Sequence, residues 1–378
     1  MIYYEVKTMA HIKKIYIDSY RGIKNLELDN LSMVNIITGD NNCGKTSVLE
    51  VIQSYSQPDD ISLWRSLTRK DLRNPIRAGM TLYEGFYDLF DINSEEKYIS
   101  YIIKSEGKEE QILLHGTVTE EEIPEEEYAE ILGMYPQRDK KRDQFVDNIQ
   151  LVAKLNVEIF LNEELIVKEN FYEGQYYLNG PYKGKEKRLS KNITYISPVR
   201  HAEGNLFLSR VLDNPDLYEE MLIVLKEFDS DIVSINYDAE NNRLPSRGVY
   251  KILSKAHQKA LPLNVYGDGM KKAVLLMSAV IQAKGGILLL DEFETAIHTS
   301  AMNKIFKWIL ETCKKLDVQV FMTSHSKEAI DKVLKCAPEL INDIAVYTMY
   351  KNDDNISVRR LDARKAIEVQ DEMGLELR

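Results

Sequence analysis

The sequence predicts an α/β fold with a mixed or parallel central sheet, an antiparallel β subdomain and an inserted helical region. Three observations lead to this class. Residues 39–46 are Gly-Asp-Asn-Asn-Cys-Gly-Lys-Thr, a match to GxxxxGK[ST] that lies between an apolar segment and a helical one. A second apolar segment, residues 287–290, ends in Asp291 and Glu292. Strand and helix patterns then alternate through the last third of the chain, which is typical of parallel sheets.

The first sixty residues predict three strands and one helix. Apolar and polar residues alternate over 12–17, which indicates a half-buried strand, and residues 26–28 indicate a short second one. Residues 33–38 are more uniformly apolar and predict a buried strand that leads into the glycine-rich loop. We expect a helix from Lys45, because apolar residues then recur at helical spacing, and we expect it to end before Pro58.

The middle of the chain predicts antiparallel strands and a small helical excursion. Four segments have a period of two: 98–103, 111–114, 149–157 and 158–167. An acidic stretch at 120–127 is broken by Pro124. We therefore expect one domain built from two sequence halves, about 1–60 and 190–378, with strands and helices inserted at about 60–190.

The last part of the chain has the most regular pattern. Helical spacing covers 208–228 and a strand pattern covers 232–237. The remaining expected elements are a helix at 270–283, a strand at 287–290, a helix at 301–314, a strand at 318–322, a helix at 327–334, and a hairpin of 344–350 with 355–361. This alternation of strands and helices predicts a parallel sheet.

The composition indicates a globular chain that does not coat nucleic acid. Its hydrophobic content of 44% allows a full core, and its net charge of −11 opposes nonspecific binding to phosphate backbones. Two local basic segments, 138–142 and 183–188, are candidates for DNA contact or for solvated loops. Three separated cysteines without a CxxC pair favour a reducing, cytoplasmic setting. We expect no membrane association, because no long apolar run occurs.

The glycine-rich loop predicts a site for ATP with Mg²⁺. Its backbone N–H groups would point at the phosphates, and the following helix N-terminus would add positive potential. Lys45 would neutralise the β and γ oxygens, and Thr46 would offer its hydroxyl to the metal. The candidate binding residues are Gly39, Asp40, Asn41, Asn42, Cys43, Gly44, Lys45, Thr46 and Ser47. We further expect ATP to protect the Cys43 thiol from alkylation, and the absence of an NKxD motif disfavours GTP.

The apolar strand that ends in two acids has the form of a Walker B segment. Asp291 would hold Mg²⁺, directly or through water, and Glu292 would act as the catalytic base that polarises the attacking water. The alternative is a buried strand followed by two solvated acids. The long separation of this segment from Lys45 exceeds the needs of a compact P-loop fold and indicates an insertion.

Two further motifs fit the same chemistry. A long apolar helix begins at Gly267, Asp268 and Gly269. This is the second glycine-rich helix start of the chain, and it is best explained as a loop that reaches the nucleotide of another subunit. The alternative is a flexible helix start. His325 follows the strand at 318–322, where open α/β sheets bind ligands, and there it could contact the γ-phosphate as a catalytic residue. A histidine that only packs is the alternative.

The order of the four motifs resembles the ABC-type ATPase heads of the SMC, RecF and OLD group, with the OLD-like ATPases of bacterial anti-phage defence as the closest match. Residues 19–24, Ser-Tyr-Arg-Gly-Ile-Lys, resemble the phenylalanine-arginine-glycine segment of that group, which implies that Arg21 lies near the nucleotide. Tyr266 replaces the serine of transporter-type signatures. Because few residues follow His325, we expect the chain to lack the TOPRIM nuclease domain of full-length OLD proteins.

The resemblance implies an ATPase that dimerises, or assembles further, around ATP. It would couple its nucleotide state to a separately encoded effector, a nuclease or a toxin, in anti-phage defence. A RecF-like DNA repair ATPase is the second hypothesis, with DNA as the candidate partner. The third is a regulatory binding module that ATP clamps shut without functional hydrolysis. An ABC transporter subunit fits least, because the signature loop differs.

Overall fold

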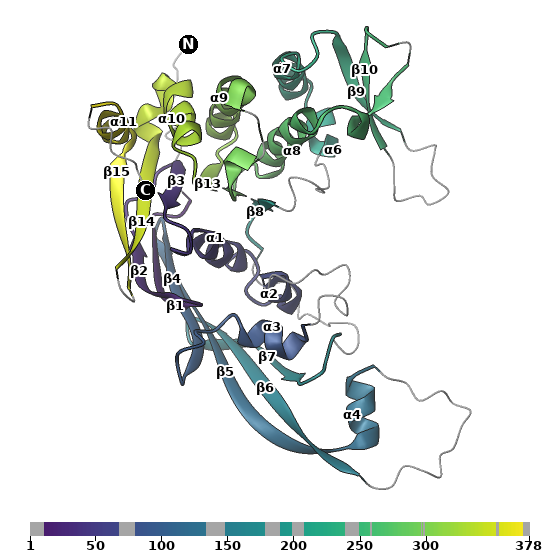
Figure 1. The fold of residues 1–378 in the computed structure, drawn as a ribbon, viewed down its shortest axis with the longest axis vertical. Helices are drawn as coiled ribbons and strands as arrows, with labels where there is room; N and C mark the ends of the chain where they lie inside the picture. Colours follow the sequence, from purple (N-terminus) through teal and green to yellow (C-terminus); the bar gives the residue numbers. More distant parts are fainter. Residues whose placement is uncertain are drawn as a thin grey trace.

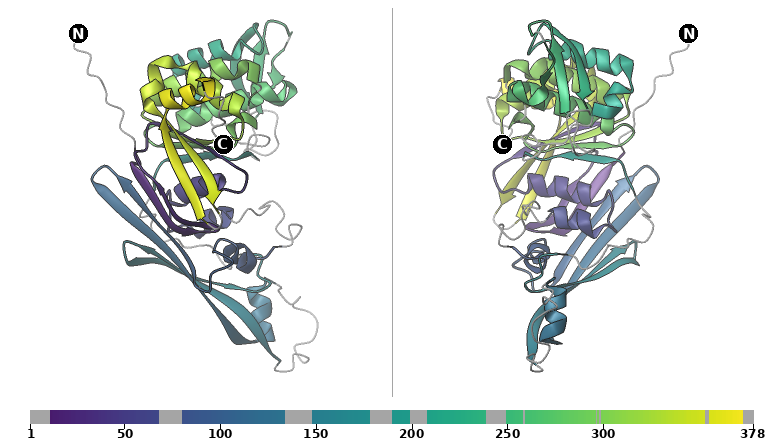
Figure 2. Two further views of the ribbon diagram at one scale, coloured as in Figure 1. Left: turned by 60° about the vertical axis from the view of Figure 1, so that its left-hand side comes forward. Right: turned by 90° about the vertical axis from the view of Figure 1, so that its right-hand side faces the viewer.

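The molecule has a central sheet covered by helices and a long antiparallel sheet that extends away from it (Figure 1). This computed structural model describes residues 11–67, 80–133, 148–177, 190–198, 208–238, 249–257, 259–295, 297, 299–352 and 355–372. The two further views show the antiparallel sheet descending below the helical part of the molecule (Figure 2). Both basic segments that the sequence offered for DNA contact, 138–142 and 183–188, lie outside the described residues.

The central sheet has the strand order β15-β14-β3-β13-β12-β8. Its strands are β3 (Val34–Gly39), β8 (Ile193–Ile196), β12 (Ile287–Leu290), β13 (Gln319–Thr323), β14 (Ile344–Asn352) and β15 (Asn355–Asp362). All neighbours pair in parallel except β14 and β15, which form the expected antiparallel hairpin. The mixed, mainly parallel sheet predicted from the sequence is therefore confirmed.

The central strands are apolar throughout because the sheet is buried on both faces. In β12, Leu288 and Leu290 belong to one hydrophobic core, and Ile287 and Leu289 belong to the other. The first core lies under α8 (Asp268–Gln282), α9 (Thr299–Lys315) and α10 (Lys327–Cys336). The second is shared with α1 (Lys45–Ser54) and the antiparallel sheet. The central sheet is thus the middle layer of the molecule.

The antiparallel sheet has the order β2-β1-β4-β5-β6-β7. Its strands are β1 (Lys14–Tyr20), β2 (Ile23–Leu28), β4 (Lys97–Ser105), β5 (Lys108–Pro124), β6 (Ile149–Leu161) and β7 (Glu164–Tyr172). Three short helices accompany it, namely α2 (Ile61–Leu67), α3 (Leu82–Tyr87) and α4 (Glu125–Ile131). Pairing of β1 with β4 joins the middle of the chain to the N-terminal strands in one sheet.

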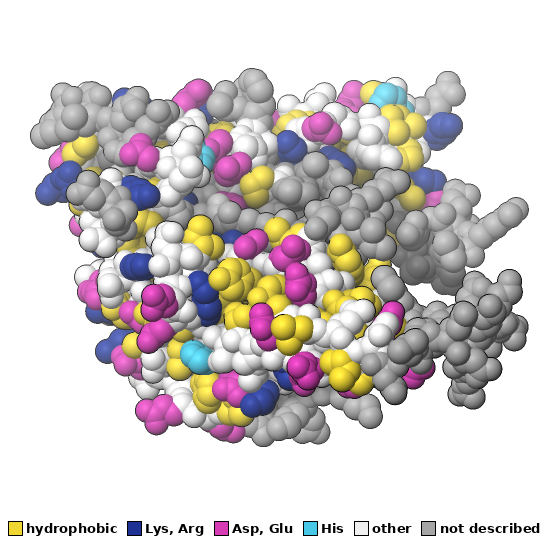
Figure 3. Space-filling view, turned by 60° about the horizontal axis from the view of Figure 1, so that its bottom comes forward, with side chains coloured by type: hydrophobic (Ala, Val, Ile, Leu, Met, Phe, Trp, Pro, Cys, Tyr) yellow, Lys and Arg dark blue, Asp and Glu magenta, His cyan; other side chains and the backbone are white. Residues whose placement is uncertain are grey.

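The far end of this sheet extends beyond the core. Ile149 and Leu151 are each 63% exposed, and the paired stretch of β5 is rich in glutamate. When the lower end is turned forward, hydrophobic and acidic side chains mix across the face displayed (Figure 3). The inner half of the same two strands, by contrast, is buried against the second core.

A small three-stranded sheet completes the fold. It consists of β9 (Ile232–Asp238), β10 (Val249–Ser254) and β11 (Leu261–Pro262), beside α6 (Leu208–Leu212) and α7 (Pro215–Leu225). Three 3₁₀ helices, Leu263–Val265, Phe293–Thr295 and Pro338–Asp343, and the terminal helix α11 (Ala363–Glu372) fill the remaining connections. Within the described ranges, no helix has the length and apolar character needed to cross a membrane.

Three boundaries predicted from the sequence were wrong. The strand expected at 111–114 is the longer β5, Lys108–Pro124, which takes in most of the acidic stretch. The strands expected at 149–157 and 158–167 are instead a longer β6 and a displaced β7, joined at Asn162 and Glu163, both of which have positive φ. Such a two-residue turn fits hairpin geometry, and asparagine tolerates it well. The single helical segment expected at 208–228 is two helices, because Asn214 caps α7 and a proline occupies its first turn.

Candidate functional site

The glycine-rich loop joins β3 to α1 with a backbone that glycine makes possible. Gly39, Asn42 and Gly44 have φ values of 135°, 61° and 88°. A Cβ on Gly39 would lie 1.9 Å from the carbonyl oxygen of Met349, so no side chain fits there. Left-handed residues within a short loop turn successive N–H groups toward one point, which forms a concave site for an anion. The helix dipole of α1 adds positive potential at the same place.

Lys45 supplies a buried positive charge to this loop. Its side chain is 5% exposed, and Nζ donates to the carbonyl oxygens of Gly39, at 2.8 Å, and Asp40, at 2.6 Å. The Sγ atom of Cys43 lies 3.7 Å away. These partners compensate the buried ammonium in the structure described, and phosphate oxygens would make stronger, charge-assisted contacts with it.

Asp291 lies beside the loop although it is distant in sequence. The hydroxyl of Thr46 donates to its Oδ1 at 3.2 Å across a separation of 245 residues. Thr323 Oγ1 donates to the same oxygen at 2.5 Å, and Tyr195 donates to Oδ2 at 3.2 Å. A hydroxyl and a carboxylate in contact at the start of a helix are the ligands that Mg²⁺ takes in P-loop proteins, so this pair fits the metal.

Glu292 and His325 face each other across the same region. Glu292 has a φ of 48°, a costly conformation for a side chain with a Cβ, and its N–H donates to Thr323 Oγ1 at 2.8 Å. The Nε2 atom of His325 lies 3.9 Å from Glu292 Oε1, with both side chains partly exposed. His325 N donates to Glu294 Oε1 at 2.7 Å, which holds the turn before α10 in place.

These residues share one cavity of about 620 Å³. Its lining residues are Gly22, Ile23, Asn41, Asn42, Gly44, Lys45, Thr46, Ser47, Glu292, His325, Lys351 and Ile356. The structure thus brings together the loop, the base candidate Glu292 and His325. Asp291 lies directly behind them through its contact with Thr46.

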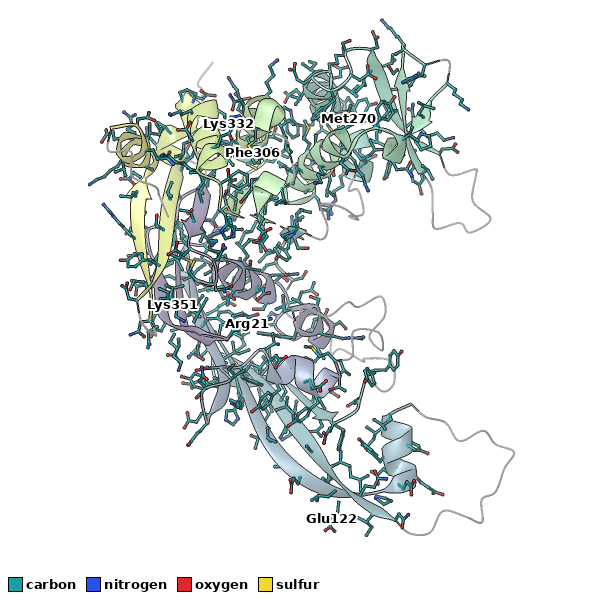
Figure 4. The ribbon with its side chains drawn as sticks, in the orientation of Figure 1. Arg21, Glu122, Met270, Phe306, Lys332 and Lys351 are labelled. Atoms are coloured by element: carbon teal, nitrogen blue, oxygen red, sulfur yellow. The ribbon has the colours of Figure 1, made fainter. Side chains whose placement is uncertain are left out.

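Arg21 is not among the residues that line the cavity, and its nearness to the nucleotide stays a prediction. Its Nε lies 3.2 Å from Glu50 Oε2, and Nη2 donates to the carbonyl oxygen of Leu67 at 2.7 Å. These contacts hold the guanidinium against α1 and the end of α2, where Figure 4 labels the residue. The next two residues, Gly22 and Ile23, line the cavity instead.

The loop of Gly267, Asp268 and Gly269 lies apart from this cavity. Gly267 is the N-cap of α8 and, like Asp268, is exposed. Gly269 packs near the ring of Phe228. None of the three is among the residues that line the cavity. The sequence hypothesis that this loop reaches the nucleotide of another copy therefore stays a prediction.

The thiol of Cys43 is unsuited to the alkylation test expected from the sequence. Its side chain is fully buried in the second core. Burial raises the pKa of the thiol, and the nearby Lys45 offsets this only in part. Little thiolate is therefore accessible to an alkylating reagent even without nucleotide. Cys43 can serve the site through its backbone N–H and through the contact of its Sγ atom with Lys45 Nζ.

Several site residues had no clear signal in the sequence. Thr323 and Tyr195 contact Asp291, but a threonine or tyrosine at a strand end is common. Lys351 and Ile356 come from the terminal hairpin and reach the cavity only through the order of the central sheet. A pattern along the chain does not reveal such spatial neighbours.

Comparison with known proteins agrees with the fold and the motifs. An ATP/GTP phosphatase of Helicobacter pylori is 25% identical over 338 residues, which is 85% of this chain and 86% of that protein. A 42-residue segment is 48% identical to the DNA replication and repair protein RecF of Clostridium acetobutylicum, covering 11% of this chain and 12% of that one.

A solved SMC head bound to the C-winged helix domain of ScpA has a similar fold. The TM-score is 0.52 at 12% identity, over 94% of this chain and 100% of that one. The family described as "AAA domain, putative AbiEii toxin, Type IV TA system" matches residues 34–331, well over half of the chain. The protein therefore belongs to this family, and its fold is that of an ABC-type ATPase head.

Proposed function

We propose that this protein binds ATP with Mg²⁺ and hydrolyses it. The observation that carries the proposal is the meeting of Thr46 with Asp291, with Lys45, Glu292 and His325 on the same cavity. A glycine turn that served only to join a strand to a helix would not need these partners. The sequence similarity to an ATP/GTP phosphatase over most of both chains supports the same activity.

Each residue has a distinct role in the proposed reaction. Lys45 and the N–H groups of the loop hold the phosphates and neutralise charge that develops on them. Thr46 and Asp291 would hold Mg²⁺, which would supply further charge stabilisation when bound. Glu292 accepts a proton from the attacking water, because its carboxylate is partly exposed and faces the cavity. His325 lies close enough to orient that carboxylate.

We further propose that the site closes between two copies of the chain in the cytoplasm. The exposed helix start at Gly267 and Asp268 is free to face a second molecule's phosphates, since it lies away from its own cavity. ATP would then dimerise the protein, and the nucleotide state would be passed to a separate effector, a nuclease or toxin, in anti-phage defence. The similar SMC head is itself bound to a partner domain.

Mass measurement of the purified chain tests binding and closure together. With Mg²⁺ and a nonhydrolysable ATP analogue, wild-type protein should shift from monomer to dimer. Lys45→Ala should bind the analogue at least about a hundredfold more weakly and stay monomeric, because it loses the buried cation of the loop. If the protein stays monomeric in every condition but still binds ATP, the proposed closure between two copies is wrong and the proposed ATP site stands.

A RecF-like role in DNA repair is the second candidate function. The short segment that is 48% identical to RecF is the specific observation that favours it. In that case the ATP-bound dimer should bind duplex DNA, and binding should weaken steeply as salt rises. Absence of binding to duplex or single-stranded DNA at low salt, in the presence of the analogue, would exclude this role.

A further inference from the structure

The nucleotide cavity has a second cationic side chain, on the terminal hairpin, that the motifs did not point to. Lys351 lies on β14 and lines the same cavity as Lys45. Figure 4 labels it near the lower end of the β14–β15 hairpin. Among the described residues, no hydrogen bond or ion pair engages its ammonium group. The side chain is exposed and lines the cavity, so its ammonium group can reach an anion bound there.

The order of the central sheet brings this side chain over the loop. β14 runs parallel to β3, and their pairing ends with Met349 opposite Gly39. β14 continues to Asn352, so its last residues project past the end of β3, where the phosphate loop begins. The close approach of the Met349 carbonyl oxygen to Gly39 fixes the hairpin against this loop.

Ile356 sets the position of Lys351 within the hairpin. The two residues are cross-strand partners, so their side chains share one face. Ile356 Cδ1 lies 3.6 Å from the point that a Cβ on Gly44 would occupy, and Ile23 Cδ1 lies 2.9 Å from it. Both isoleucines therefore flank the Gly44 end of the loop. Lys351 is held at this end of the cavity.

The charges in the cavity favour such a cation. A nucleoside triphosphate brings about four negative charges, and Glu292 adds one on the same wall. Bound Mg²⁺ and Lys45 would together supply three positive charges, against which the carboxylate of Asp291 behind Thr46 also counts. Arg21, the further cation that the resemblance implied, is already paired with the buried carboxylate of Glu50. Lys351 is the remaining cation on the described lining.

We propose that Lys351 binds the nucleotide's phosphates beside Gly44, as a second cation supplied by the terminal hairpin. This inference rests on the proposed function, since it assigns one more contact in the same site. A contact at the Gly44 end, where the loop holds the β-phosphate, serves ADP as well as ATP. Lys351 is therefore a residue for affinity, whereas the hydrolytic step belongs to Glu292.

Binding of ATP and of ADP to the full chain, measured by calorimetry with Mg²⁺, tests this role. Lys351→Ala should weaken both nucleotides by a similar factor, about 5- to 10-fold, as expected for one partly exposed charge-assisted contact. Lys351→Arg should restore most of the affinity. Arg359→Ala removes the same charge from an exposed position on β15 that does not line the cavity, and should change neither affinity.

The outcomes separate this inference from the function on which it rests. Wild-type affinity in Lys351→Ala, with ATP bound normally by the unaltered chain, would overturn the role of Lys351 alone. An equal loss in Arg359→Ala would also overturn it, because the effect would then reflect general charge. An unaltered chain that binds neither nucleotide would overturn both proposals. A KM for ATP that rises in Lys351→Ala while kcat stays constant would support the inference independently.

Discussion

The two six-stranded sheets of this protein differ in what they carry. The central sheet ends in the residues of the candidate site: the glycine-rich loop follows β3, Asp291 and Glu292 follow β12, and His325 follows β13. Among the described residues, the antiparallel sheet contributes to the cavity Gly22, in the turn between β1 and β2, and Ile23, the first residue of β2. Parallel strands gather their carboxyl ends at one edge, whereas antiparallel strands distribute theirs over two.

The antiparallel sheet instead supports the helix of the phosphate loop. Glu110 on β5 is 2% exposed, and its Oε2 accepts hydrogen bonds from Tyr55, at 2.5 Å, and from Lys191, at 2.6 Å. Tyr55 is the C-cap of α1, and Lys191 precedes β8. In the middle of α1, Glu50 pairs with Arg21. The central sheet thus positions the residues of the candidate site, and the antiparallel sheet holds α1, the helix that follows the glycine-rich loop.

The largest effect should come from the first glycine of the loop. Gly39→Ala places a Cβ 1.9 Å from the Met349 carbonyl oxygen, at a φ of 135°. We expect a loss of several kcal/mol, about 2–5, in the free energy of unfolding, together with loss of ATP binding. Thermal and chemical unfolding measure the first, and calorimetry the second. Gly267→Ala, with open space around its Cβ, should leave stability unchanged.

A large but purely structural effect is expected in the supporting sheet. Glu110→Ala leaves Lys191 without its buried partner and should cost about 3 kcal/mol of stability. Burial opposes the charge of Glu110, but hydrogen bonds from Lys108, Lys191 and Tyr55 outweigh it and lower its pKa to about 2. Because the folded pKa is lowered, this stabilisation is present above the ordinary pKa of glutamate. It is lost as pH falls from about 4.5 toward about 2.

Denaturant unfolding between pH 4.5 and pH 2 measures how much the Glu110 carboxylate contributes to stability. The difference in the free energy of unfolding between wild type and Glu110→Ala should become smaller as pH falls. Glu109→Ala, an exposed neighbour on the other face of β5, should stay within about 0.5 kcal/mol of wild type. If this difference in unfolding free energy stays constant down to pH 2, the carboxylate charge of Glu110 contributes nothing to stability.

A substitution in the central sheet should have a moderate effect, which lowers the turnover of ATP and leaves its binding unchanged. Thr323→Val keeps the shape of the side chain but removes the hydroxyl that contacts Asp291 and the N–H of Glu292. We expect kcat to fall about 10- to 30-fold while the affinity for ATP changes little, since the two acids lose their alignment. Steady-state ATP hydrolysis measures this. Thr38→Val is the control, because its buried hydroxyl has no partner among the described residues.

The smallest effect is expected at Cys43. Alkylation of its thiol, followed by mass spectrometry of the native protein, should be slow and should change less than about twofold on adding ATP. The reason is that the thiol faces the second core and its pKa is raised by burial. Rapid modification that ATP suppresses would mean that the loop exposes this side chain.

Local patterns were sufficient to predict five of the six strands of the central sheet, all but β8, and most of its site. Each of these features is one contiguous segment, so a pattern along the chain can reveal it. They are the apolar strands β3 and β12, the glycine-rich loop after β3, and the two acids after β12. The antiparallel hairpin of β14 and β15 was also predicted, at 344–350 and 355–361, since its two strands are neighbours in sequence. These elements combine strong periodicity with buried apolar residues.

Contacts between distant segments could not be predicted in this way. Lys351 reaches the cavity because β14 pairs with β3, and Tyr195 reaches Asp291 because β8 pairs with β12. The turn at Asn162 and Glu163 was missed because half-exposed strands alternate weakly. The ion pair of Arg21 with the buried Glu50 is a further contact between distant segments that no pattern along the chain revealed.

Turnover by Glu292→Gln tests the central claim most directly. Glutamine keeps the size of the side chain and its ability to hydrogen-bond but cannot accept a proton from water. ATP hydrolysis, measured as phosphate release with Mg²⁺, should fall at least about a hundredfold, while ATP affinity stays near that of wild type. Phosphate release at the wild-type rate in this variant would contradict the assignment of Glu292 as the base of an ATP-hydrolysing site.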